Sequence, residues 1–324
     1  MNETSLLFGE DFPEVVYHYT SMDVLLKIVE KREFWATNAR FLNDVSERDH
    51  FLSLVERQLV HMAGREGALP TIRSLCDGFA KYAKEHRRFT ELPYVVSFSA
   101  EPDSLAQWRA YCARGNGVCI GIRTDSLRQA AVKAVDGRSL TDEPLSVDPE
   151  VAFQRVLYLS AEDQAQIIKM ILSEIERVNF LFAVHKWHTF MSAQDELSTR
   201  FNDLLERRAA SCKNPAFSAE AEYRLIATAT DAPEKVLRYR SAKTSIVPYL
   251  AISAEDPTDF LKTGDRLRKT DQGFLECTPY FIESVMIGPN PNGDLSAEVL
   301  NTMFEGQRSN VKISRSNIPY RDWL

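Results

Sequence analysis

The fold opens on Val15-Val16-Tyr17-His18-Tyr19-Thr20-Ser21, a stretch that combines β-branched and aromatic residues. Such residues favour a strand, because they fit a pleated and half-buried surface. Ser21 is a typical helix cap, and the apolar residues of 24–29 then recur on one helical face. This stretch therefore predicts a short strand that runs directly into a helix, with His18 near the junction.

Further strand and helix patterns follow, without regular alternation. Strand-like segments occur at 33–37, 94–99, 118–122, 155–158, 221–227, 236–239, 245–252, 281–287 and 311–314. Helical patterns occur at 46–86 (broken near 64–70), 103–111, 160–211 and 295–304. This order predicts an α+β fold with a mixed, mostly antiparallel sheet, and not a doubly wound sheet.

The domain organisation is expected to be simple. The chain shows no internal repeat and no Ser/Gly-rich linker, so we expect one domain over residues 1–324. Ser160 and Asp163 match a capping box at the start of the largest helical block. We interpret 160–211 as a helical insertion within that domain.

Composition bounds the class of protein. The 324 residues carry a formal net charge of −7, which disfavours nucleic acid as a general partner. A local site built around Lys213, Arg224 and Arg321 is compatible with that charge. No apolar run approaches the roughly 20 residues of a membrane span. Five widely spaced cysteines form no CxxC pair, and the N-terminal segment lacks a secretory pattern, so we expect a cytoplasmic location and no membrane partner.

Common catalytic motifs are absent from the sequence. It contains no GxGxxG, Walker loop, HExxH or GxSxG pattern. His185 and His188 share a helical face, but no third ligand is evident, so no metal site is predicted.

Several particular segments recur in a characteristic order. They are Tyr17–Ser21, Phe41–Asp44 with Glu47, Ser97–Ser99, Trp108 with Tyr111, Gly115 with Gly117, Lys213 with Phe217, Glu220, Glu222 and Arg224, Ile287–Pro289, and Ile318–Arg321. In this order and spacing the chain resembles the bacterial domain-of-unknown-function family 2971 from about Tyr17 to Arg321.

A second, remote resemblance concerns the ADP-ribosyltransferase superfamily. A strand with His-Tyr, a middle strand with Ser-x-Ser and a late strand with Glu are similar to the motifs of that superfamily. The resemblance implies that His18 contacts the adenosine-side ribose of NAD and that Ser97 and Ser99 shape the nicotinamide pocket. It also implies that Glu222 or Glu220 is the catalytic carboxylate. The sequence departs from the superfamily pattern at the middle motif, which lacks a clear Ser-Thr-Ser or a stacking Tyr.

The resemblance also implies an ADP-ribosyltransferase-like core, NAD as cofactor and a nucleotide as the small-molecule partner. The expected function is that of an ADP-ribosyltransferase or NAD glycohydrolase, with a toxin or defence role. The remaining candidate residues are Tyr19, Thr20 and Arg224 for the cofactor and Asn43, Asp44, Glu47, Lys213 and Arg321 for the substrate.

Two other classes of function stay open. Asp44, Glu47, Glu220 and Glu222 are also compatible with a metal-dependent nuclease or phosphoesterase, if their carboxylates converge. A non-enzymatic binding or sensor module is the third reading. Because Glu220, Glu222 and Arg224 alternate along a predicted strand, we expect all three to share one sheet face.

Overall fold

The structure is a computed structural model of the chain. It describes residues 12–44, 46–84, 88–112, 115–128, 130–132, 151–184, 193–229, 233–242, 244–253, 267–269, 275–277, 281–306 and 310–320. Arg321, His185 and His188 lie outside the described residues. Among the described parts of the chain, Cys76, Cys119 and Cys212 are free thiols.

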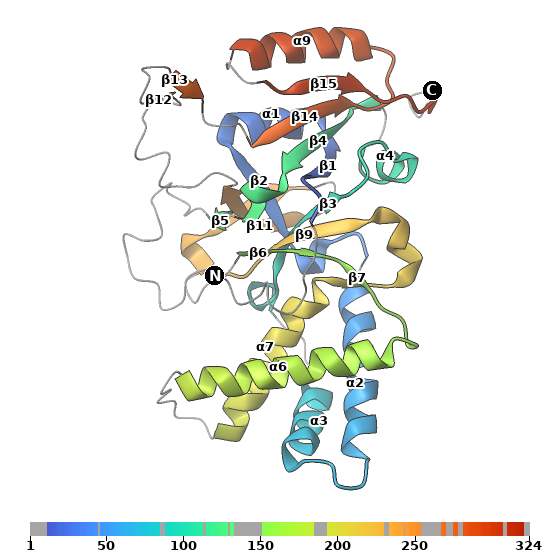
Figure 1. The fold of residues 1–324 in the computed structure, drawn as a ribbon, viewed down its shortest axis with the longest axis vertical. Coiled ribbons are helices and arrows are strands. Elements are labelled where there is room, and N and C mark those ends of the chain that lie inside the picture. Colours follow the sequence, from blue (N-terminus) through green and yellow to red (C-terminus); the bar gives the residue numbers. More distant parts are fainter. Residues whose placement is uncertain are drawn as a thin grey trace.

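Eleven of the described strands form one sheet (Figure 1). They are β1 (Val15–Ser21), β2 (Glu33–Asn38), β3 (Tyr94–Ser99), β4 (Gly117–Arg123), β5 (Ala131–Val132), β6 (Val151–Arg155), β9 (Glu222–Ala227), β10 (Leu237–Ser241), β11 (Ile246–Ser253), β14 (Ile282–Ile287) and β15 (Lys312–Arg315). Within this sheet β14 and β15 pair in parallel, and the other pairs are antiparallel. The mixed sheet with its helices confirms the predicted α+β class.

Two small strand pairs lie apart from the main sheet. They are β7 (Leu157–Tyr158) with β8 (Cys212–Lys213), and β12 (Leu267–Lys269) with β13 (Leu275–Cys277). The segment 155–158, predicted as one strand, is therefore divided between the end of β6 and β7.

The strand β3 is the branch point of the sheet. One edge of β3 pairs with β9 over its whole length, from Tyr94 to Ser99. Its other edge pairs with β2 at Tyr94 and Val95 and with β1 at Ser99. The described strands make no pair with that edge between Val95 and Ser99. The sheet therefore splits there, with β1 leading to β4 and β14, and β2 leading to β11 and β10.

Helices form two groups around the sheet. Near the sheet lie α1 (Met22–Lys31), α4 (Leu105–Tyr111), α5 (Thr124–Arg128) and α9 (Gly293–Gly306). A separate lobe contains α2 (Glu47–Ala63), α3 (Pro70–Tyr82), α6 (Gln164–Val184) and α7 (Ala193–Ala209) (Figure 1). Short 3-10 turns complete the chain: η2 (Ala39–Phe41), η3 (Phe89–Glu91), η6 (Pro215–Glu220) and η7 (Pro233–Lys235).

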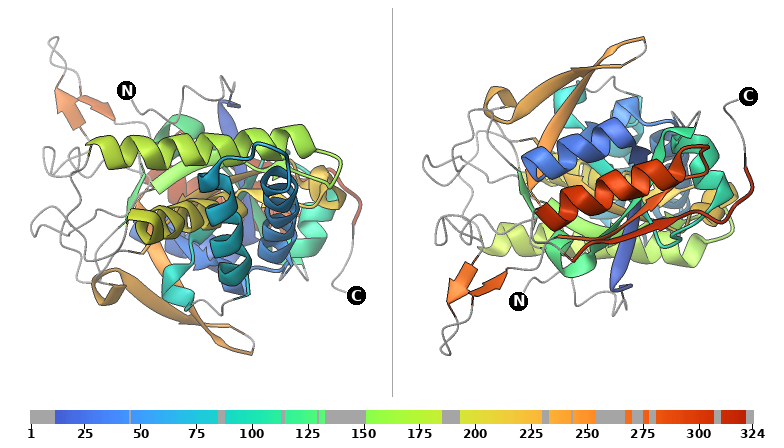
Figure 2. Two further views of the ribbon diagram at one scale, coloured as in Figure 1. Left: turned by 90° about the horizontal axis from the view of Figure 1, so that it is seen from below. Right: turned by 90° about the horizontal axis from the view of Figure 1, so that it is seen from above.

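Each group of helices has its own core. Leu25 and Ile28 of α1 and Phe304 of α9 join the apolar cluster of the sheet, and both helices lie over it in Figure 2. The lobe has a second cluster, in which α2 and α3 pack against α6 and α7. The segment 160–211 thus shares its core with helices from the first hundred residues. None of the described helices combines the length and apolar character needed to cross a membrane.

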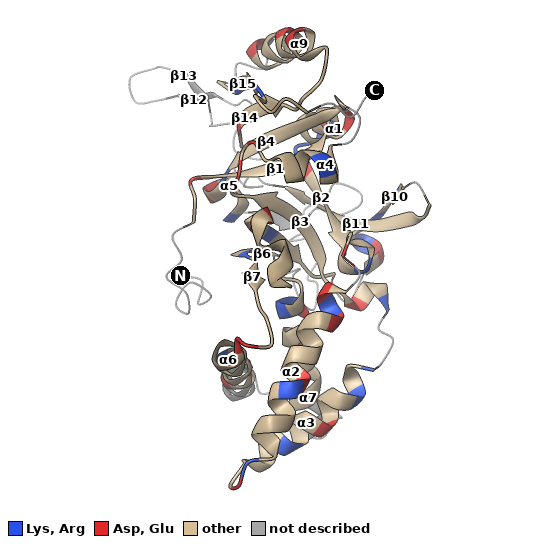
Figure 3. Ribbon diagram, turned by 90° about the vertical axis from the view of Figure 1, so that its right-hand side faces the viewer, with Lys and Arg blue, Asp and Glu red and all other residues tan. Residues whose placement is uncertain are grey.

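Charge on the lobe helices is mixed in sign. In Figure 3, Lys and Arg alternate with Asp and Glu along α2, α3 and α7. Residues of both signs therefore occur along these helices.

Candidate functional site

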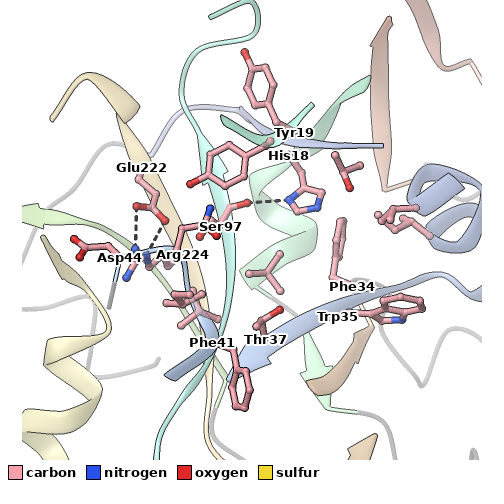
Figure 4. Close-up of a pocket in the computed structure, with 18 of the residues that line it drawn as sticks. His18, Tyr19, Phe34, Trp35, Thr37, Phe41, Asp44, Ser97, Glu222 and Arg224 are labelled. Atoms are coloured by element: carbon pink, nitrogen blue, oxygen red, sulfur yellow. Dashed lines mark hydrogen bonds and ion pairs between the residues drawn. The ribbon is translucent and has the colours of Figure 1, made fainter. Parts of the chain in front are cut away.

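A cavity of about 310 Å³ lies at the split in the sheet, next to β1, β2 and β3. Ten of the thirteen predicted site residues line it, although they come from five separate stretches of the chain. They are His18, Tyr19, Thr20, Asn43, Asp44, Glu47, Ser97, Lys213, Glu222 and Arg224 (Figure 4). A single pocket therefore gathers most of the side chains that the sequence singled out.

His18 occupies the gap between the two branches of the sheet. Its Nδ1 lies 2.9 Å from the carbonyl oxygen of Ser97. A carbonyl oxygen only accepts, so Nδ1 carries the proton and Nε2 is the acceptor in the neutral ring. Burial lowers the pKa of His18, although the bond to Ser97 opposes that shift, so the neutral ring is favoured.

The surroundings of His18 fix the plane of its ring. The rings of Phe34 and Phe98 each lie 5.6 Å from it, centroid to centroid. Nε2 has no hydrogen-bond partner among the described residues, and His18 lines the cavity. His18 is therefore a fixed hydrogen-bond acceptor for a bound molecule.

Arg224 of β9 is the centre of an ion-pair cluster. Its guanidinium donates to Glu47 at 2.8 and 2.9 Å and to Glu222 at 2.7 and 3.1 Å. A fifth hydrogen bond, of 2.8 Å, goes to the carbonyl oxygen of Ala210. All five N–H donors of this arginine are satisfied. Such a doubly bidentate arrangement fixes both carboxylates in position.

Lys213 of β8 closes the cluster from the other side. Its Nζ lies 2.6 Å from Glu220, 3.0 Å from Glu222 and 3.3 Å from Glu47. The ammonium also lies 5.0 Å from the ring centroid of Phe217. Three carboxylates thus face two cations, which leaves the cluster with a formal charge of −1.

The expected placement of Glu220 on the same strand face is wrong. Glu220 ends η6, and β9 begins only at Glu222. Ala221 between them has a φ of 43°, in the left-handed region, which interrupts the extended backbone. Glu220 reaches the cluster through Lys213, and it is not among the residues that line the cavity.

The cluster keeps Glu222 ionised. Burial would raise the pKa of Glu222, but Arg224 and Lys213 hold it below the usual range. The same contacts raise the pKa of Lys213 and of Arg224 against the effect of burial. Glu222 is therefore a fixed negative charge, and its oxygen atoms already accept from Arg224 and Lys213.

Asp44 presents a carboxylate oxygen of a different kind. Its Oδ1 accepts from the backbone N–H of Ser46 at 2.9 Å and from the Ser46 hydroxyl at 2.6 Å. Its Oδ2 is buried and has no partner among the described residues. Because Asp44 lines the cavity, this oxygen is an acceptor that a ligand could satisfy.

Two predicted residues have internal partners instead. The Ser99 hydroxyl donates to the carbonyl oxygen of Glu220 at 2.8 Å, and Ser99 does not line the cavity. The Tyr19 hydroxyl donates to the carbonyl oxygen of Glu101 at 2.7 Å and accepts from the N–H of Ser104 at 2.9 Å. Both residues support the walls of the site.

The far wall of the cavity consists of residues that sequence reasoning did not assign to the site. Lys27 of α1, Trp35 and Thr37 of β2, and Arg240 of β10 line it. Lys27 falls within the helical pattern of 24–29, Trp35 and Thr37 within the strand pattern of 33–37, and Arg240 directly after that of 236–239, and none of these patterns reveals a shared pocket. In Figure 4, Trp35 and Thr37 lie away from Glu222 and Arg224.

The described side chains of this site do not form a set of metal ligands. Within the described ranges, no group of three or more His, Cys, Asp or Glu side chains could hold a metal ion. The carboxylates of Glu47, Glu220 and Glu222 do converge, but Lys213 and Arg224 occupy the space between them.

Comparison with known proteins gives a family match over part of the chain. Neither the curated proteins nor the solved structures contain a match to the chain. A family model described as "Protein of unknown function (DUF2971)" matches residues 107–225, a range that contains Lys213, Glu222 and Arg224. The match bears out the resemblance to this family over residues 107–225, and the segments before and after that range lie outside the match. Through residues 107–225, the chain is therefore related to the DUF2971 family.

Proposed function

We propose that the cavity binds NAD and promotes cleavage of its nicotinamide–ribose bond, as in an ADP-ribosyltransferase or an NAD glycohydrolase. One observation carries this proposal: two unpartnered acceptors, Nε2 of His18 and Oδ2 of Asp44, face one cavity beside a fixed anionic cluster. Ribose hydroxyls are donors that suit such acceptors. The volume of about 310 Å³ lies at the lower end of the range for small-molecule sites.

The charge of the cluster suits this reaction. Breaking the bond between ribose C1′ and the nicotinamide nitrogen leaves positive charge on the sugar, while neutral nicotinamide departs with the electron pair. The cluster of Glu47, Glu220, Glu222, Lys213 and Arg224 carries a formal charge of −1, and Asp44 adds another negative charge. Charges fixed before the reaction stabilise the transition state more than the ground state.

The geometry divides the work between two carboxylates. The oxygens of Glu222 accept from Arg224 and Lys213, so Glu222 acts as a fixed charge and not as a base. Oδ2 of Asp44 is the acceptor that a ribose hydroxyl reaches. Water or an acceptor group of another molecule then adds to C1′ and loses a proton.

The test is release of nicotinamide from NAD by the purified chain, measured by chromatography, with ADP-ribose binding followed by calorimetry. We expect slow, saturable release, and a decrease of about 10²- to 10³-fold in kcat for Asp44→Asn. Asp125→Asn is the matched control, because it makes the same charge change at an exposed position of α5 that does not line the cavity. The absence of both nicotinamide release and ADP-ribose binding would overturn the proposal. Binding without release would favour a sensor module.

A further inference from the structure

Arg240 lines the cavity with most of its N–H donors unsatisfied by the described residues. One of its five N–H donors bonds to a described residue, the hydroxyl of Thr37 at 3.0 Å. Its Nε is buried without a partner, and no carboxylate of the described residues lies within ion-pair distance. Arg238, two residues earlier on β10, contacts Glu33 at 3.3 Å. Arg224, across the cavity, has all five donors satisfied.

The buried and unpartnered Nε of Arg240 costs free energy of folding in the absence of a ligand. Burial lowers the pKa of the Arg240 guanidinium, in keeping with a cation that is partly removed from water. Guanidinium groups recognise phosphate oxygens through paired N–H donors. The Thr37 hydroxyl accepts from Arg240, so its own proton remains available to a ligand oxygen.

Lys27 adds a second cation to the same wall. It lines the cavity from α1, and its Nζ lies 5.4 Å from the ring centroid of Trp35. The ring limits the directions in which the ammonium group extends. The cations Lys27 and Arg240 belong to α1 and to the β2–β11–β10 branch, whereas the anionic cluster lies at β9, on the other edge of β3.

We propose that Arg240, Lys27 and Thr37 form a subsite for a phosphate or diphosphate group, so that the ligand is a nucleotide whose diphosphate lies across the cavity from Glu222. This inference rests on the proposed function in naming the whole ligand. The subsite itself requires only a phosphoryl group. The anionic cluster repels that group, and the two ends of the cavity therefore orient the ligand.

The test compares ligands that differ in phosphate. Calorimetry measures binding of ADP-ribose, of inorganic pyrophosphate and of nicotinamide riboside, which has no phosphate. We expect Arg240→Gln to weaken binding of ADP-ribose and pyrophosphate by about 10- to 100-fold and to leave nicotinamide riboside unchanged. Arg240→Lys, which keeps the charge but loses the planar fork, should give a smaller loss.

The matched control is Arg73→Gln, which makes the same charge change at an exposed position of α3. Thermal unfolding of each variant confirms that the fold is intact. Equal ADP-ribose affinity in Arg240→Gln and the unaltered chain would overturn the subsite, as would an equal loss for nicotinamide riboside.

The two proposals fail in different ways. Pyrophosphate binding that depends on Arg240, without any cleavage of NAD, supports the subsite and refutes the proposed function. Cleavage of NAD with an unchanged KM in Arg240→Gln supports the function and refutes the subsite.

Discussion

At the scale of single residues, His18 combines two tasks at one ring. Nδ1 holds the carbonyl of Ser97 at the point where β3 lacks a strand partner, and Nε2 faces the cavity. The first task stabilises the split in the sheet, and the second is available to a ligand. Protonation of Nε2 would remove the acceptor, so the second task requires the neutral ring, whereas Nδ1 donates to Ser97 in either protonation state.

The pH dependence of stability should report this requirement. The pKa of His18 is lowered in the folded state, so the unfolded chain binds a proton first as pH falls below about 6.5. The contribution of His18 is therefore complete above that pH and is lost below it, by at most about 1.4 kcal/mol per pH unit. Urea unfolding between about pH 7.5 and 5.5 measures this, with His18→Asn as the variant that does not titrate.

We expect the pH slope of the unaltered chain to exceed that of His18→Asn in this window. His61→Asn is the control, because His61 is exposed on α2. A slope in His18→Asn equal to that of the unaltered chain would show that His18 does not titrate differently in the folded state.

The sequence indicates which side chains belong to the site better than it indicates their hydrogen-bond partners. His18, Asp44 and Glu222 were singled out from their positions near strand and helix ends. The hydrogen bond of His18 was not predictable, because its partner Ser97 lies 79 residues away in the sequence. Arg240 was missed, because an isolated arginine in a strand resembles any solvent-exposed residue.

At the scale of elements, the ion-pair cluster joins two layers of the molecule. Glu47 is the first residue of α2, and Glu222 and Arg224 belong to β9. Arg224 is only 1% exposed, so its removal leaves buried carboxylates without a counterion. The contact between α2 and β9 therefore depends on this arginine.

We expect Arg224→Met to lower the free energy of unfolding by about 3–5 kcal/mol, because Glu47 and Glu222 lose their main partner. The control is Lys312→Met, which breaks the exposed Lys312–Glu283 pair and should cost less than about 1 kcal/mol. Guanidinium unfolding measures both variants. A cost for Arg224→Met as small as that of the control would mean that water replaces the lost contacts.

Most elements were predictable from local pattern. The strand at 94–99 matches the prediction, as does the break of the helical stretch between Ala63 and Pro70. The branching of the sheet at β3 was not predictable, because it arises from pairing between segments far apart in the chain. The break before Glu222 was also missed, since alternation in sequence does not reveal the left-handed backbone of Ala221.

At the scale of the whole molecule, the lobe and the sheet have separate apolar cores. The lobe core draws Phe51 and Phe79 from α2 and α3, and Ile171 and Phe201 from α6 and α7. The segment 160–211 thus covers apolar surface that earlier helices provide. The cavity depends on both parts, because Glu47 begins a lobe helix and His18 belongs to the sheet.

Deletion of 160–211 tests this organisation. We expect the shortened chain to expose the apolar faces of α2 and α3 and to aggregate, because a buried Phe contributes on the order of 2–3 kcal/mol when removed from water. Size-exclusion chromatography and dye binding to exposed apolar surface measure the outcome. A monomeric chain with a sharp thermal transition would instead show that the segment is a dispensable insertion.

The closed charge cluster also limits how this sequence can change over evolutionary time. Arg224 is paired with both Glu47 and Glu222, so its replacement alone leaves two buried carboxylates without their main counterion. A tolerated replacement must then alter two or more positions at once, and such concerted changes are rare in a lineage. We infer that selection on folding alone would preserve this pattern of lysine, glutamates and arginine, even in descendants that had lost the activity of the pocket.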